Sequence, residues 1–255
     1  MRFVVCGAVG NDEVRQAREG SDAVVGALGV AMALARRGVE TEFVARLGDD
    51  PLAVDLLGVL ERAGIGSGWC PRFEGPTCEA MLAWRRPEPP RLTEDDWLHV
   101  SGPVALGEPG HSALMTRLAT TRATISCDLC LDHLGAAPES LLAELDRLLQ
   151  VVGEAGGIVM VHHRDLAALG VLEDEEDLPE TLRELAHSWA EAYGLAMVVV
   201  HFDTWVEAVK PDGRVEIQQD HAPSGAGLDG NFVAGFLHRY VHDPMALDRA
   251  LLAVG

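Results

Sequence analysis

Short apolar runs alternate with longer stretches of helical periodicity over most of the chain. The short runs predict buried strands at residues 3–6, 41–46, 97–101, 123–127, 157–161 and 197–200. The longer stretches predict helices at residues 24–37, 51–64, 108–119, 138–149, around 166, and 179–194. Strands and helices that alternate in this way are typical of a parallel sheet with helices on its faces. The pattern therefore predicts the α/β class.

Residues at the ends of these elements add detail. Asp50 and Pro51 supply an N-cap and a proline at the first helical position. Residues 10–12 predict a turn at the carboxyl end of the first strand, which places Asp12 at a strand exit. Residues 205–209 and 214–217 flank a turn, so we expect an antiparallel pair of strands there.

Residues 69–98 interrupt the alternation. The sequence from 69 to 84 has the character of short strands, and residues 85–91 are rich in proline and charge. We interpret this stretch as a small lid. Its strands either close one site or pair between two subunits, which would give a homodimer.

The composition limits the class of protein further. The chain has 255 residues, of which 48% are hydrophobic, so residues 1–255 can form one large domain. Its net charge of −20 disfavours nucleic acid and anionic membrane surfaces as partners. The sequence has no basic and apolar leader and no apolar run of the roughly 20 residues that cross a bilayer. We expect a cytoplasmic protein.

The five cysteines are spread over the chain, and their number is odd, which favours reduced thiols. Cys127 and Cys130 have the CxxC spacing but lack a second close pair for zinc, so we interpret them as structural thiols. Lys210 is the only lysine, and no GxxxxGK pattern surrounds it, which argues against a Walker A phosphate loop.

A glycine-rich turn leads into a helix at residues 223–240 and is the main candidate for chemistry. Aromatic residues recur there at helical spacing, at Phe232, Phe236 and Tyr240. Free backbone amides and the positive end of the helix dipole suit a phosphate or another anion. The alternative is an ordinary connection in which Asp229 or Asn231 caps the helix.

The order of these segments resembles the ribokinase-like, or PfkB, family of carbohydrate kinases over nearly the whole chain. The residues that carry the resemblance are 30–51, His99-Val-Ser-Gly102, Ser224-Gly-Ala-Gly227 and Phe232-Val-Ala-Gly-Phe-Leu237. The resemblance implies a three-layer sandwich with a central, mainly parallel sheet and a β-lid over a sugar site. It also implies transfer of the ATP γ-phosphate, with Mg²⁺, to a hydroxyl of a sugar- or nucleoside-like small molecule. Phosphoryl transfer needs positioning, a base and charge neutralisation.

The resemblance also implies roles for particular residues. Asp229 takes the place of the base. The anion hole falls on Gly225, Ala226, Gly227, Leu228 and Gly230. The substrate-binding positions fall on Asp12, Gly26 and Gly29. The nucleotide or metal region falls on His162, Asp165, His201 and Asp203.

Several of these positions depart from the family pattern. The turn after Gly225 is two residues longer than the family's Gly-Ala-Gly-Asp-Ala-Phe, so Asp229 matches the base in neither ungapped register. Gly29 stands where the family has a sugar-binding asparagine. The chain has 28 residues after Gly227, fewer than the resemblance implies. We therefore expect the nucleotide half of the site to differ.

The polar motifs of the nucleotide half are replaced as well. His162-His-Arg-Asp165 stands for the family's Asn-x-x-Glu, and His201-Phe-Asp203 for its Thr-x-Gly. The strand end Asp-x-Asn-x-Arg becomes Asp128-Leu-Cys-Leu-Asp132, which keeps only the first acid. Imidazole and carboxylate at two strand exits can bind a transition metal or exchange protons near neutral pH. The sequence thus leaves open a divergent kinase, a pseudokinase that only binds its ligand, and a different enzyme that uses the same cleft.

Overall fold

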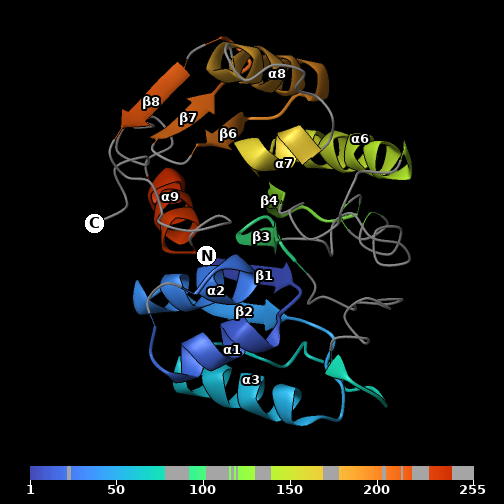
Figure 1. Cartoon of the computed structure of the whole chain (residues 1–255), viewed down its shortest axis with the longest axis vertical. Helices are drawn as coiled ribbons and strands as arrows, with labels where there is room; N and C mark the ends of the chain where they lie inside the picture. The colour runs from blue at the N-terminus through green and yellow to red at the C-terminus, as the bar shows by residue number, and fades with distance from the viewer. Residues whose placement is uncertain are drawn as a thin grey trace.

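The computed structural model describes residues 1–21, 24–77, 92–101, 115, 118, 120–129, 139–168, 178–202, 205–213, 215–219 and 230–242. Within these ranges the chain forms a sheet of eight strands with helices on both faces (Figure 1). The strands are β1 (Arg2–Gly7), β2 (Thr41–Val44), β3 (Asp96–Ser101), β4 (Thr124–Leu129), β5 (Ile158–His162), β6 (Met197–His201), β7 (Trp205–Val209) and β8 (Val215–Gln219). The helices are α1 (Asn11–Arg18), α2 (Gly26–Arg36), α3 (Pro51–Arg62), α6 (Glu139–Glu154), α7 (His163–Ala168), α8 (Leu178–Tyr193) and α9 (Gly230–His242).

The strand order is β2-β1-β3-β4-β5-β6-β7-β8. The pairs from β2 to β6 are parallel, and β7 and β8 are antiparallel to their neighbours. The predicted parallel sheet is confirmed, as is the antiparallel pair around the turn that begins at Lys210. Six parallel strands therefore end at the same edge of the sheet, which we call the carboxyl edge.

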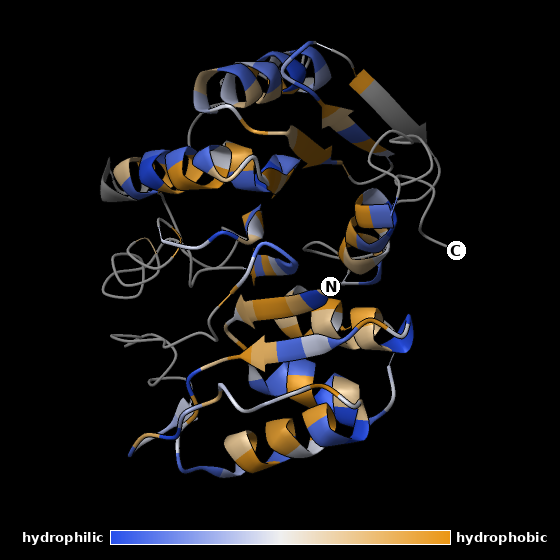
Figure 2. Ribbon diagram, turned by 180° about the vertical axis from the view of Figure 1, so that it is seen from behind, coloured by the Kyte–Doolittle hydropathy of each residue, from blue (hydrophilic) through white to orange (hydrophobic). Residues whose placement is uncertain are grey.

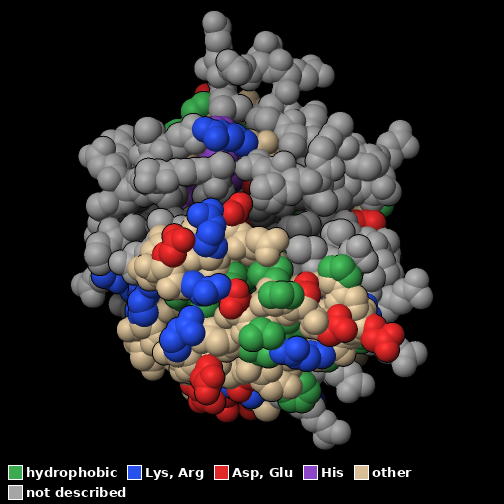
Figure 3. Space-filling view, turned by 60° about the horizontal axis from the view of Figure 1, so that its bottom comes forward, with side chains coloured by type: hydrophobic (Ala, Val, Ile, Leu, Met, Phe, Trp, Pro, Cys, Tyr) green, Lys and Arg blue, Asp and Glu red, His purple; other side chains and the backbone are tan. Residues whose placement is uncertain are grey.

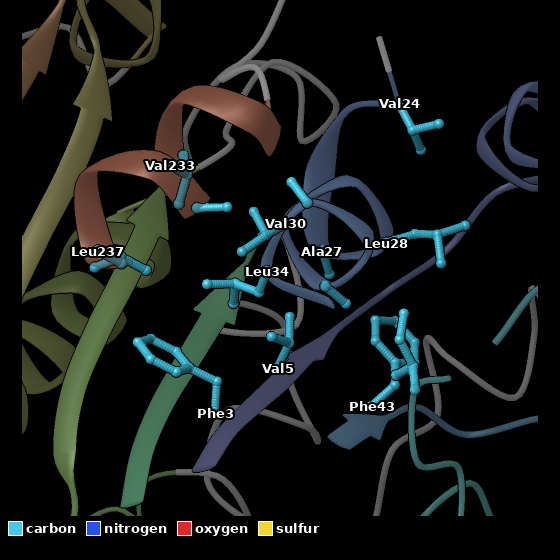
Figure 4. Packing of buried hydrophobic residues seen from close by; sticks show 14 of the residues in the cluster. Phe3, Val5, Val24, Ala27, Leu28, Val30, Leu34, Phe43, Val233 and Leu237 are labelled. Atoms are coloured by element: carbon cyan, nitrogen blue, oxygen red, sulfur yellow. The ribbon is translucent and has the colours of Figure 1, made fainter. Parts of the chain in front are cut away.

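Two hydrophobic layers cover the sheet. Helices α1, α2, α3 and α9 pack on one face, and α6, α7 and α8 pack on the other. Figure 4 shows Val30 and Leu34 of α2 between α9 and strand β1. In Figure 2 the strands are mostly hydrophobic, whereas α3 and α6 alternate hydrophobic and hydrophilic residues. A parallel strand is buried on both faces, and this explains the continuous apolar runs in the sequence.

Helix α3 begins as predicted, because the side chain of Asp50 accepts a hydrogen bond from the backbone N–H of Ala53 at 3.0 Å. The predicted turn at residues 10–12 is instead the start of a helix. Val14 and Ala17 of α1 are buried on one face, and its first turn carries two acids, which favours a helix at this position.

Some predicted elements lie outside the described residues. These are the strands expected in residues 78–84 and most of the helix at 108–119. Residues 69–77, which begin the predicted lid, are described and pack on the loop after β2. There the N–H of Leu47 donates to the carbonyl of Pro71 at 3.0 Å, and the N–H of Phe73 donates to the carbonyl of Leu47 at 2.8 Å.

The described helices are all too short or too polar to cross a membrane. Acidic and basic side chains are interspersed over the end of the molecule that carries α3 (Figure 3). The described surface at this end therefore has no broad basic patch that would attract a polyanion. Among the described residues, Cys6, Cys70 and Cys127 are free thiols, as predicted.

Candidate functional site

Helix α9 runs opposite to the parallel strands. Its first turn meets the carboxyl end of β6, where the rings of Phe232 and His201 lie 4.2 Å apart at 88°. Near its other end, Tyr240 meets Trp97 at the beginning of β3, with ring centroids 6.2 Å apart. The N-terminus of α9, with the positive end of its helix dipole, therefore lies at the carboxyl edge.

Two glycines let α9 approach α2 backbone to backbone. A Cβ on Gly230 would come within 2.3 Å of the carbonyl carbon of Gly29, and a Cβ on Gly29 within 1.8 Å of the carbonyl oxygen of Val24. Any side chain at these positions would push the helices apart. The glycines thus fix the position of the N-terminus of α9.

Beside this helix end, the carboxyl ends of β3 to β6 and the start of α7 carry buried polar residues that we call the edge cluster. Its members are Ser101, Asp128, His162, Asp165 and His201. Each is at most 4% exposed. Register explains their proximity, because Ser101 pairs with Asp128 and His162 pairs with His201 in neighbouring strands.

Hydrogen bonds hold the cluster together. The hydroxyl of Ser101 donates to Oδ2 of Asp128 at 3.1 Å. The backbone N–H of His162 donates to Oδ2 of Asp165 at 3.3 Å, and the N–H of Arg164 donates to Nδ1 of His162 at 3.2 Å. Because Nδ1 of His162 accepts, the proton of its neutral ring lies on Nε2.

Burial controls the charge of Asp128. Loss of hydration raises the pKa of this carboxyl to about 7, the negative charge of Asp165 also raises it, and the hydrogen bond from Ser101 opposes both. Its Oδ1 is buried and has no hydrogen-bond partner among the residues that the structure describes. A carboxyl group with a pKa near neutrality can donate or accept a proton, which suits ligand binding or acid–base chemistry.

Burial also keeps His201 neutral. Its pKa lies well below the usual value because the ring is desolvated and because His162 is its neighbour. Next to it, Nδ1 of His163 lies 3.2 Å from the carbonyl oxygen of His201, and the ring of His163 stacks on Phe202. These contacts hold the end of β6 in place.

The structure therefore brings together His162, Asp165 and His201 of the predicted nucleotide or metal region. Asp12 lies outside this cluster, in the first turn of α1 that follows the carboxyl end of β1, where its side chain is 82% exposed and pairs with Arg15 at 2.9 Å. Gly26 begins α2 with a positive φ of 65°, a backbone conformation that glycine favours. Gly29 and Gly230 are the packing contact described above.

Other predicted residues lie outside the described part of the chain. They are Asp203, Gly225, Ala226, Gly227, Leu228 and Asp229. Of the two residues in the capping alternative, Asn231 lies inside α9, and its side-chain oxygen accepts a hydrogen bond from Nη2 of Arg36 at 3.0 Å.

Sequence reasoning did not propose Ser101 and Asp128 as site residues. Both follow apolar runs at strand ends, and Asp128 keeps the acid of a family motif, so the signal was present. What the sequence lacks is the register that pairs them across β3 and β4.

A hollow of about 420 Å³ lies at the opposite, amino edge of the sheet, lined by residues that include Asp96, Trp97 and Tyr240. We place the site at the carboxyl edge instead. In open α/β sheets, ligands bind outside the carboxyl ends of the strands. Three buried polar atoms without a hydrogen-bond partner among the described residues also lie there, Oδ1 of Asp128 and both ring nitrogens of His201.

Among the described residues, no group of three or more histidines, cysteines and acids is arranged to hold a metal ion. Mg²⁺ needs fewer protein ligands, because one or two carboxylates, water and the phosphates of a substrate often complete its coordination shell. Asp128 and Asp165 lie close enough for one charge to shift the other's pKa, and Oδ1 of Asp128 is unpartnered. These two carboxylates fit Mg²⁺ in that manner.

The sheet order, the helices on both faces and the edge cluster define a ribokinase-like α/β fold. No protein-family model matches the sequence, and no curated protein matches it either. The fold is therefore established by structural similarity.

Sugar and nucleoside kinases are among the solved structures that the chain resembles. Aminoimidazole riboside kinase from Salmonella enterica matches with a TM-score of 0.71 and 15% identity, over 100% of this chain and 90% of the other. Fructokinase from Vibrio cholerae O395, bound to fructose, ADP and calcium, matches with a TM-score of 0.68 and 16% identity, over 99% and 89%. The 2-dehydro-3-deoxygluconokinase from Thermotoga maritima matches with a TM-score of 0.69 and 16% identity, over 100% and 91%.

Proposed function

We propose that the protein is a divergent PfkB-type kinase that transfers the γ-phosphate of ATP to a hydroxyl of a sugar- or nucleoside-like small molecule. The observation that carries this proposal is the position of the N-terminus of α9 beside the edge cluster, in a fold shared with sugar and nucleoside kinases. Free amides at a helix start suit a phosphoryl group.

In this proposal Asp229 is the base that takes the proton of the acceptor hydroxyl. The amides of residues 225–228 and of Gly230 bind the transferred phosphoryl group, whose negative charge they stabilise. Asp12, together with the backbone around Gly26 and Gly29, lines the acceptor side. A change of Gly29 would act through the position of α9, since this glycine has no side chain to offer and packs against Gly230.

The other half of the site binds the nucleotide. Asp128 and Asp165 would hold Mg²⁺, and His162, His201 and Asp203 would face the phosphates. When bound, Mg²⁺ supplies charge neutralisation for the phosphate oxygens. The burial of the edge cluster keeps water away from these groups, which strengthens their electrostatic interactions.

Nucleotide binding tests the proposal directly. Titration with ATP and Mg²⁺ should raise the melting temperature, because a ligand at 100 times its Kd stabilises the native state by about 2.7 kcal/mol. Titration with Mg²⁺ alone is the control. No shift at millimolar nucleotide would exclude the kinase.

The base has a separate test. Asp229→Asn should abolish phosphoryl transfer in an assay for ADP release with a panel of sugars and nucleosides, while ATP still shifts the melting temperature. Asp212→Asn is the matched control, since this exposed acid lies in the turn between β7 and β8 at the amino edge. Retained turnover in Asp229→Asn would remove this residue from the mechanism.

A second candidate function is a non-kinase enzyme, or a binding protein, that uses the same edge. The buried pair of His162 and His201 beside Asp165 favours it, because imidazole and carboxylate can exchange protons. Metal analysis of the purified protein and the variants His162→Ala and His201→Ala distinguish the two. No bound metal and no effect of either variant on turnover would leave only a binding role.

A further inference from the structure

His201 is a buried polar side chain whose ring lacks hydrogen bonds. The residue is 0% exposed, and neither Nδ1 nor Nε2 of its imidazole has a hydrogen-bond partner in the described part of the chain. An unpaired buried polar group costs about 1–3 kcal/mol, so native proteins usually pair such groups with protein, water or ligand. The ring nitrogens of His201 therefore fit a polar ligand group that would hydrogen-bond to them.

The surroundings of the ring indicate where this occupant lies. The edge of one ring meets the face of the other where His201 contacts Phe232, which belongs to the first turn of α9. The main chain of His201 is fixed by pairing with His162 of β5 and Val206 of β7. The ring is thus held against the helix end whose unpaired amides attract anions.

The charged and titratable neighbours keep the ring neutral. His162 is its neighbour on β5, and Asp165 accepts a hydrogen bond from the backbone N–H of His162. On the other side, Arg36 and Arg37 bind Asn231 in the first turn of α9. The desolvation of the ring and the positive end of α9 both disfavour an imidazolium. A neutral imidazole offers one N–H donor and one acceptor nitrogen.

We propose that His201 is a ligand-binding residue whose neutral imidazole N–H donates a hydrogen bond to an anionic phosphoryl oxygen held at the N-terminus of α9. If the phosphoryl group belongs to ATP or ADP, this proposal rests on the proposed kinase function. Free phosphate and pyrophosphate share the same chemistry. Two observations support the proposal about His201: its ring nitrogens lack hydrogen-bond partners among the described residues, and its ring contacts Phe232 in the first turn of α9.

The experiment measures the affinity of the full-length protein for four probes, ATP, ADP, pyrophosphate and inorganic phosphate, by calorimetry. His201→Phe keeps a ring of similar size but removes the donor, and His201→Gln supplies an amide N–H. We expect His201→Phe to weaken binding about tenfold to a hundredfold, as for a hydrogen bond to a charged group, and His201→Gln to recover most of it. His187→Phe, on the outer face of α8, is the matched control and should bind like wild type.

A spectroscopic measurement keeps the proposal testable if a variant does not fold. The ¹⁵N signals of His201 in the wild-type protein should report a neutral ring, and its N–H proton should shift downfield when the probe binds. An unchanged signal upon saturation would overturn the proposal.

The outcomes separate this proposal from the kinase function. Binding of ATP that is equal in wild type, His201→Phe and His201→Gln would overturn the role of His201 and leave the kinase in place. Binding of phosphate or pyrophosphate that depends on His201, without binding of ATP, would support the role of His201 and overturn the kinase. A wild-type protein that binds none of the four probes would overturn both.

Discussion

His99 is buried in the middle of β3. Its Nδ1 lies 2.9 Å from the hydroxyl of Ser126, which also accepts a hydrogen bond from Nε1 of Trp97 at 2.8 Å. Burial lowers the pKa of His99 to about 3. The ring is therefore neutral in the native state over the whole physiological range and makes stability depend on pH.

This dependence gives a prediction for His99→Phe. In the unfolded chain His99 becomes protonated below about pH 6.5, whereas in the native state it does so only near pH 3. The contribution of His99 to the free energy of unfolding is therefore fully present above pH 6.5 and is lost as the pH falls. The slope is about 1.4 kcal/mol per pH unit for one such group. The variant should therefore lose less stability between pH 6.5 and 4.5 in urea titrations.

Two other buried groups contribute to the same profile. His201 adds a slope of the same sign, because its pKa is also lowered. Asp128 acts in the opposite direction, since its raised pKa makes stability fall as the pH rises from 3.8 through about 7. Both contributions remain in His99→Phe, and His187→Phe serves as a control. Equal slopes in His99→Phe and wild type would contradict the assignment.

At the scale of elements, the contact between α2 and α9 decides whether a site exists. Only glycine at positions 29 and 230 allows the two backbones to touch, and this contact places the start of α9 beside His201. The predicted phosphate turn and the edge cluster come from distant parts of the chain. They meet because these helices cross so closely.

The contact predicts a large effect of Gly230→Ala. The new Cβ would lie 2.3 Å from the backbone of Gly29, and neither helix backbone can move without disturbing the core. We expect a loss of about 1–3 kcal/mol in the free energy of unfolding, and weaker phosphate binding.

Gly58→Ala in α3 is the control for the element-scale prediction. The nearest atom to its Cβ is the end of the Arg62 side chain at 3.4 Å, so alanine should stabilise the helix by about 0.5–1 kcal/mol. Denaturant titration measures both variants. A Gly230→Ala protein as stable as wild type would show that α9 is not fixed by this contact.

At the scale of the whole molecule, the edge cluster lies at the carboxyl edge of the sheet. The first part of the predicted lid, residues 69–77, packs at the same edge. The guanidinium of Arg46, after β2, lies 3.5 Å from the ring centroid of Phe73. The side chain of Asp50 accepts a hydrogen bond from the N–H of Thr77 at 2.6 Å. These contacts direct residues 69–77 along the carboxyl edge, where a lid would cover a ligand.

The alternative in which the predicted lid pairs between two subunits has its own test. Light scattering should then give a mass near twice the 27.3 kDa of the chain, and Trp84→Asp should shift it toward the monomer. Val54→Asp, at an exposed position of α3, is the control and should leave the mass unchanged. A monomer at all concentrations would exclude this assembly and leave a lid that closes its own site.

The sequence by itself determined the elements and their class. Periodicity of two and 3.6 is a local property, and caps such as Asp50 depend on a few neighbouring residues, so strands, helices and the α/β class could be predicted. The eight-residue helix α1 was missed because its apolar face consists of only Val14 and Ala17. The order of segments also predicted the ribokinase-like fold.

Only the tertiary structure decided which polar residues share a site. Asp128, Asp165 and His201 come from different strands and a helix start, and their proximity depends on register and on the packing of α9, which no local pattern encodes. Asp12 looked equivalent to them in the sequence but is exposed on α1. The shifted pKa values have the same origin, because burial in the assembled sheet desolvates a carboxyl or an imidazole that would be ordinary in the unfolded chain.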